Sequence, residues 1–113
     1  MKVQRQIIFH GHHFANFYTT QSIKVQEKIE YIFVLIRTVD RLPEKFLKHM
    51  TGTEGLYEIR IEVGSNIYRI FCCFDKGNLV ILFNGFQKKT EKTPKQEIQL
   101  ALRLMNEYFK SKK

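Results

Sequence analysis

The sequence predicts an α+β fold in which two N-terminal helices and a C-terminal helix pack on a mainly antiparallel sheet of about four strands. Three observations predict this class. Apolar residues recur with a helical period in residues 25–36, alternate with a period of two in residues 56–86, and return to the helical period in residues 98–109. Because 113 residues is an ordinary length for one domain, we expect residues 1–113 to form a single domain.

The N-terminal half is expected to supply one strand and two helices. An apolar stretch within residues 3–9 predicts the opening strand. The first helix should begin at a cap formed by Thr20 or Ser22 and end near Arg37. Its apolar face is formed by Val25, Ile29, Ile32, Phe33 and Ile36. Residues 42–50, LPEKFLKHM, indicate a short second helix with Pro43 in its first turn. The inward-facing residues of that helix would be Phe46, Leu47 and Met50.

Three strands should follow, at residues 56–63, 67–74 and 79–86, joined by the turns GSN and DKGN. If both hairpin loops have an even number of residues, one sheet face is apolar and lies against the helices. That face carries Tyr57, Ile59, Ile61, Val63, Tyr68, Ile70, Cys72, Phe74, Leu79, Ile81 and Phe83. The other carries Glu58, Arg60, Glu62, Arg69, Phe71, Cys73, Val80, Leu82, Asn84, Phe86 and Lys88.

In this register Arg69 lies opposite Glu62 on one side and Asn84 on the other, with Arg60 one diagonal step away. An odd-length loop would instead place the two arginines on opposite faces. The last helix should cover the apolar end of the same face, with Thr93 as N-cap, Pro94 at the first helical position and Gln96 completing a capping box. Its apolar stripe would be Ile98, Ala101, Leu102, Met105 and Phe109. The uncovered part of the face then forms a cationic cleft.

The charge of the chain favours a polyanionic partner. Its net charge is +8, and residues 84–113 contain eight basic and three acidic residues. No apolar run approaches the ~20 residues of a membrane helix, and the N-terminus resembles neither a signal peptide nor an anchor, so we expect a cytoplasmic protein without a membrane partner. Adjacent Cys72 and Cys73 point to opposite faces of a strand, which predicts that both are reduced packing residues.

Two interpretations of the basic residues remain open at this point. Arg69 could simply pair with Glu62, and the lysine rim, defined as Lys88, Lys89, Lys92 and Lys95, could be a solvated turn. However, an arginine held partly out of water usually binds an anion, and the start of a helix attracts phosphate. The HGHH motif, residues 10–13, has no carboxylate or thiol at ligand spacing, so we expect no metal site.

The segments GLYEIR and YRIFCCFDKGNLVILFNGFQKKTEKTPKQEIQLA, with the preceding VQEKIEYIFVLIR and RLPEKFLKHMTGTEG, closely resemble the HigB-like branch of the RelE/ParE toxins. The resemblance covers about residues 22–108. It implies a RelE/ParE-like fold with a curved antiparallel sheet. It also implies a toxin of a type II toxin–antitoxin module that cuts mRNA in the ribosomal A site, where the RNA's own 2′-hydroxyl attacks the adjacent phosphate. Such toxins are held inactive by a cognate antitoxin, often of the helix-turn-helix type.

The resemblance also implies roles for individual residues. Arg60 and Arg69 correspond to the sheet-borne cations that hold the scissile phosphate, Glu58 is a candidate base, and a lysine is a candidate acid. The expected catalytic residues are therefore Arg60, Arg69, Lys89 and Glu58, and the expected RNA-binding residues are Lys88, Lys92, Asn84, Phe86 and Lys95. Phe86 or Tyr57 could stack on a splayed base. Many relatives have histidine where Asn84 stands.

The implied chemistry requires no metal and no protein nucleophile, so no cofactor is expected. Two alternatives of other classes accompany this hypothesis. The chain could poison a topoisomerase, as ParE-type relatives do, or it could survive as a catalytically decayed corepressor that binds the antitoxin.

Overall fold

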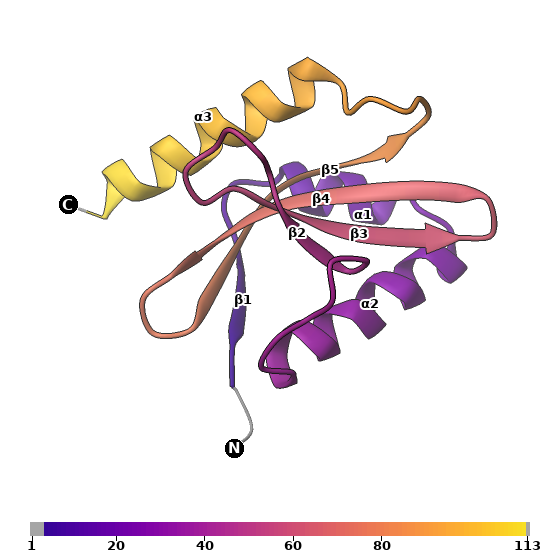
Figure 1. Cartoon of the computed structure of the whole chain (residues 1–113), viewed down its shortest axis with the longest axis horizontal. Helices are drawn as coiled ribbons and strands as arrows, with labels where there is room; N and C mark the ends of the chain where they lie inside the picture. Colours follow the sequence, from indigo (N-terminus) through magenta and orange to yellow (C-terminus); the bar gives the residue numbers. More distant parts are fainter. Residues whose placement is uncertain (1–3, 113) are drawn as a thin grey trace.

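The computed structural model describes residues 4–112, which form three helices and one five-stranded sheet (Figure 1). The strands are β1 (Gln6–Phe9), β2 (Leu47–His49), β3 (Tyr57–Val63), β4 (Asn66–Asp75) and β5 (Leu79–Lys88). The helices are α1 (His13–Thr19), α2 (Ile23–Thr38) and α3 (Lys95–Ser111). The sheet order is β1-β5-β4-β3-β2, with β1 parallel to β5 and every other neighbouring pair antiparallel. The predicted α+β class is confirmed.

Helix α2 agrees with its prediction. The hydroxyl of Ser22 accepts a hydrogen bond from the backbone N–H of Val25 at 3.3 Å, so Ser22 rather than Thr20 is the cap. All five residues of the predicted apolar face are buried. The helix was found by its period because it runs over four turns with one face in the core.

The second N-terminal helix is α1, and it is not where the sequence predicted it. Helix α1 has seven residues, too few to show a clear apolar period, and only Phe14 is fully buried. The prediction of a helix at residues 42–50 was wrong. One turn follows Pro43, whose carbonyl accepts from the N–H groups of Phe46 and Leu47, and the chain then becomes edge strand β2. Hydrogen bonds to β3 outweigh the helical tendency of this segment.

Strands β3 and β4 are joined by a two-residue turn at 64–65, so the prediction that Arg60 and Arg69 share a face is confirmed. The predicted register was wrong by two residues. Arg60 lies directly opposite Arg69, whereas Glu62 lies opposite Ile67. Gly64 has a φ of +61°, a conformation that allows the tight two-residue turn. This turn is shorter than the predicted pairing requires, and the register is shifted accordingly.

The hairpin between β4 and β5 contains two irregularities whose effects cancel. Its loop has three residues, 76–78, because Asp75 pairs with Leu79. This odd length places Leu79, Ile81 and Phe83 on the second face rather than the first, and Val80 and Leu82 on the first, so their predicted positions were wrong. A β-bulge between Ile70 and Cys72 then shifts the register once more. Residues 84, 86 and 88 consequently lie on the face predicted for them.

The two faces of the sheet carry separate hydrophobic clusters. Helices α1 and α2 cover the first face, and α3 covers part of the second (Figure 1). The capping box predicted for α3 was wrong, because Pro94 occupies the N-cap position and no side chain caps the helix. Ala101 and Leu104 are the fully buried residues of α3, and Phe109 is 41% exposed instead of buried.

Cys72 and Cys73 are both free and both buried, on opposite faces of β4, as predicted. Burial raises the pKa of the Cys72 thiol and raises that of Cys73 to about 12. Both are therefore unreactive packing residues near neutral pH. No helix within residues 4–112 is both long enough and apolar enough to cross a bilayer.

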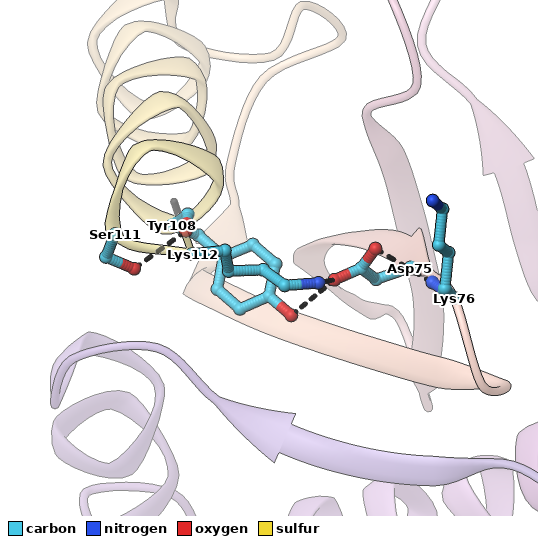
Figure 2. A network of polar contacts seen from close by, with 5 residues as sticks. All are labelled: Asp75, Lys76, Tyr108, Ser111 and Lys112. Atoms are coloured by element: carbon cyan, nitrogen blue, oxygen red, sulfur yellow. Dashed lines mark hydrogen bonds and ion pairs between the residues drawn. The ribbon is translucent and has the colours of Figure 1, made fainter.

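A polar network fixes the end of α3 to the β4–β5 loop (Figure 2). The carboxylate of Asp75 accepts hydrogen bonds from the Tyr108 hydroxyl at 2.6 Å and the Lys76 backbone N–H at 2.8 Å, and it pairs with the Lys112 ammonium. These donors lower the pKa of Asp75 to about 2, with Lys112 contributing most. Burial and the bond to Asp75 raise the pKa of Tyr108 to about 12. The network therefore favours ionised Asp75 and neutral Tyr108.

This network makes a prediction for acid stability. Because the folded-state pKa of Asp75 lies below its ordinary value of 3.8, its stabilising effect is complete above that value and is lost as the pH falls toward 2. Asp75→Asn should lower the urea midpoint at pH 6 and flatten its pH dependence between about pH 4 and pH 2. Asp40→Asn is the control, since the Asp40 carboxylate has no ion-pair or hydrogen-bond partner among residues 4–112. Equal acid profiles for the two variants would contradict the prediction.

Candidate functional site

Three charged side chains meet on the second face of the sheet, and we call them the charged cluster: Glu58, Arg60 and Arg69. The carboxylate Oε1 of Glu58 lies 3.2 Å from Arg60 Nε and 3.7 Å from Arg69 Nε. Strand pairing explains the arrangement, because Arg60 and Arg69 are cross-strand partners and Glu58 is two residues from Arg60 on the same face. The partner of Arg69 is therefore Glu58, and not Glu62 as the sequence had suggested.

The charged cluster is unusual in its burial. Glu58 is 6% exposed and Arg69 4% exposed, whereas Arg60 is half-buried. Burial lowers the pKa of Arg69, the Glu58 carboxylate raises it, and the charge of Arg60 lowers it again. Two guanidinium groups share one carboxylate, so the cluster carries one excess positive charge largely out of water.

The hydrogen bonding of the charged cluster is incomplete. Arg69 donates from Nη1 to the carbonyl of Tyr68 at 3.2 Å, and Arg60 donates from Nη1 to the carbonyl of Glu44 at 3.5 Å. The Nε atoms of both arginines are buried, and neither has a hydrogen-bond partner among residues 4–112. Both Nε atoms are enclosed beside the Glu58 carboxylate at ion-pair distance, so the cluster attracts an anion through its excess positive charge and not through these atoms.

A pocket opens above Glu58 between β2 and the start of α3. It is lined by Lys48, His49, Met50, Thr51, Glu58 and Thr93. Lys48 lies directly opposite Glu58 in the β2–β3 pairing, which brings a further cation to the same face. The sequence did not suggest Lys48 because residues 42–50 were predicted as a helix. The signal that could have found it is its place just before the Gly- and Thr-rich loop that leads into the charged strand.

The lysine rim lies beside the charged cluster but does not share its pocket. Lys88 and Lys89 line a separate hollow with Ser65, Ile67, Thr90 and Glu91, and Lys92 and Lys95 are exposed. Lys88 pairs with Ile67, two residues along β4 from Arg69, whose partner on β5 is Phe86. The rim therefore supplies accessible positive charge at the end of β5, next to the cluster.

Asn84 and Phe86 are buried rather than presented to a ligand. The amide of Asn84 donates to the Glu97 carbonyl at 3.1 Å and to its carboxylate at 3.0 Å, which ties β5 to the first turn of α3. Phe86 is 8% exposed and packs on Phe71 with ring centroids 5.6 Å apart. Tyr57 lies on the first face, against Phe74, and is therefore on the opposite side of the sheet from the arginines. As placed here, neither aromatic ring offers a free surface in the cluster.

The histidines do not assemble into a metal centre in the part of the chain that the structure describes. Within residues 4–112, no three His, Cys, Asp or Glu side chains converge as metal ligands. His12 and His13 stack on each other with centroids 5.6 Å apart, and His10 packs between Phe83 and Tyr108. His10 therefore packs against the sheet and α3, whereas His12 is exposed.

Comparison with known proteins identifies one family. A family model described as phage derived protein Gp49-like (DUF891) matches residues 16–106, a range that contains the charged cluster and the lysine rim. The search of curated proteins finds no match.

Proposed function

The chain belongs to the Gp49-like family of phage-derived proteins, a family known in toxin–antitoxin modules, and from this premise we propose that it is a HigB-like toxin of the RelE/ParE superfamily that cleaves mRNA on the ribosome. The observation that carries the proposal is the charged cluster, in which two arginines share one buried carboxylate and so leave one excess positive charge. Excess positive charge in a site with low dielectric is suited to the phosphorane that forms during RNA cleavage.

In the proposed reaction the 2′-oxygen of the RNA attacks the adjacent phosphorus. The P–O5′ bond breaks, leaving a 2′,3′-cyclic phosphate and a 5′-hydroxyl. Glu58, which lines the pocket, is the proposed acceptor of the 2′-hydroxyl proton. Arg60, whose side chain is 28% exposed, is the proposed ligand of the phosphate oxygens. Lys89, the acid proposed from the resemblance for the departing O5′, lines the neighbouring hollow at the end of β5 and would have to reach the scissile bond from there.

Arg69 has a different proposed role from Arg60. Its side chain is only 5% exposed, so direct contact with RNA is restricted. We assign it to holding Glu58 as a carboxylate and adding positive potential beneath the phosphate. Lys88, Lys92 and Lys95 are proposed to bind the RNA backbone beyond the cleavage point. Asn84 and Phe86, proposed from the resemblance as RNA contacts, would act through the position of α3 and β5 instead, since both are buried.

The proposed protein partner is the cognate antitoxin. Five large apolar side chains are exposed on β1 and α2, namely Ile8, Phe9, Ile23, Tyr31 and Val34. Apolar exposure of this extent on neighbouring elements is typical of protein–protein contact surfaces. This surface belongs to elements other than the strands that carry the charged cluster, so an antitoxin bound there would leave Glu58, Arg60 and Arg69 uncovered.

Expression of the chain without its antitoxin tests the proposed function. We expect growth to stop and translated messages to acquire new 5′-hydroxyl ends within their coding regions, which can be mapped by sequencing ligated RNA ends. An inhibitor that empties the ribosome of mRNA should remove these ends. Intact messages in arrested cells would refute the proposal, and DNA-damage signalling in the same cells would point to a topoisomerase poison.

A further inference from the structure

A second cationic hollow, which we call the edge hollow, lies beside the charged cluster. It has a volume of about 330 Å³ and is lined by Lys28, Lys45, Phe46, Arg60, Glu62 and Gly64. Three cations thus face one carboxylate. They come from segments far apart in the chain: α2, the turn before β2, and β3. The fold therefore assembles this charge, and no run of the sequence reveals it.

The edge hollow occupies the part of β3 that β2 leaves uncovered. Strand β2 pairs with β3 only from Tyr57 to Ile59, and the last backbone bond joins Arg60 N–H to the Phe46 carbonyl at 2.8 Å. Strand β3 continues to Val63, and Figure 1 shows its end projecting past β2. Because backbone groups of alternate residues point to the same edge, the Glu62 N–H points the same way as that of Arg60. A backbone donor therefore faces the same edge of β3 as the hollow.

The ammonium groups of the two lysines in the edge hollow are not paired with carboxylates within residues 4–112. Neither Lys28 nor Lys45 forms an ion pair within residues 4–112; their ammonium groups lie over the rings of Tyr31 and Phe46, at 5.5 and 4.9 Å. Such rings hold the ammonium groups in place without neutralising them. The positive charge of the hollow remains available for an incoming anion.

Arg60 connects the edge hollow to the charged cluster. Its Nε lies 3.2 Å from Glu58, while its side chain also lines the hollow. One row of paired residues crosses the sheet from the edge hollow to the lysine rim. In this row Glu62 pairs with Ile67, and Ile67 pairs with Lys88. Adjacent strands are about 4.8 Å apart, so this row spans roughly 10 Å. A chain of phosphates bound at Arg60 would find cations on both sides.

We propose that the edge hollow binds a backbone phosphate of single-stranded RNA next to the scissile phosphate, through Lys28 and Lys45. The inference rests on the proposed function and adds to it a second fixed point on the substrate. An RNA strand held on both sides of the cleavage point keeps its 2′-oxygen aligned with the phosphorus, which is the main requirement of this reaction.

The test measures binding separately from cleavage. A fluorescent single-stranded RNA carrying 2′-O-methyl groups cannot be cut, and its affinity for the full chain is followed by anisotropy across a salt series. Lys28→Ala with Lys45→Ala should weaken binding about fivefold or more and reduce the slope of log K against log[salt] by about 0.7 to 1. The matched control, Lys76→Ala with Lys110→Ala, removes the same charge from exposed positions on the β4–β5 loop and α3, and should change the slope much less.

Equal effects of the two double variants would overturn the inference, because the loss would then reflect net charge alone. Unchanged RNA affinity combined with weaker antitoxin binding would also overturn it and would identify an acidic protein segment as the occupant. Thermal melting of each variant checks that the fold is retained. If messages are cut but the hollow variant binds RNA like the wild type, only this inference fails. If the hollow is required for binding but messages stay intact, the proposed function fails instead.

Discussion

Replacement of Arg60 by alanine should reduce the rate of message cleavage by about 10²- to 10³-fold, the loss typical of removing one donor to a developing oxyanion. Arg60 is the arginine of the charged cluster that reaches solvent, and its side chain lines the edge hollow as well. The change removes both the phosphate contact and the excess positive charge of the cluster. Initial rates of cleavage of a translated message in a purified translation system measure the effect.

The stability of the Arg60→Ala protein should change little, by about 1 kcal/mol or less, because the arginine is partly exposed. Glu58 is not left uncompensated, since Arg69 remains 3.7 Å from its carboxylate. Arg103→Ala is the matched control: it removes an arginine that is 65% exposed and paired with Glu107 on α3. Full cleavage by Arg60→Ala with an intact fold would show that Arg60 is only a structural partner of Glu58.

Gly85→Ala should destabilise the fold by about 1–3 kcal/mol, the range for adding atoms to a packed site. A Cβ at residue 85 would lie 2.6 Å from Cδ2 and 2.9 Å from Cε2 of Phe17. The ring belongs to α1, which packs on β5 at this point, so either the helix or the strand would have to move. Urea denaturation of the wild type and the variant measures the difference.

A double-mutant cycle identifies Phe17 as the cause. Phe17→Leu replaces the phenyl ring by a smaller aliphatic group, so Gly85→Ala should cost clearly less in the Phe17→Leu background than in the wild type. The same cost in both backgrounds would contradict the proposed clash and would place the effect in the backbone of β5.

The elements that were predictable from sequence are those whose own residues repeat a long pattern. Helix α2 shows four turns of a single buried face, and β3 alternates cleanly enough to place Glu58, Arg60 and Glu62 on one face. The strand conformation of β2 was not predicted, because it depends on hydrogen bonds to a strand that begins eight residues later, and a local sequence pattern does not contain that information. Helix α1 was not predicted, because its two turns are too few to show an apolar period.

The candidate site was predictable to a similar degree. The shared face of Glu58 and Arg60 follows from alternation, and Arg69 joins them because the β3–β4 loop has an even number of residues. The choice of Glu58 over Glu62 as its partner depends on the exact turn length. The burial of Asn84 and Phe86 depends on how closely α3 covers β5, a tertiary property without a local signature. Lys28, Lys45 and Lys48 reach the site from segments that only the folded chain brings together.

The bulge between Ile70 and Cys72 reverses the change of face that the odd-length loop imposes on β5. Between the loop and the bulge, the residues of β5 keep the orientation that the odd loop imposes; beyond it, the orientation is reset. A loop longer or shorter by two residues would keep each β5 side chain on its present face. A change of one residue would move the side chains of residues 79–83 to the opposite faces of the sheet. The bulge thus lies between the solvent-exposed loop and the part of the hairpin that contains Arg69. The loop can vary in steps of two residues without changing the face on which the arginines lie.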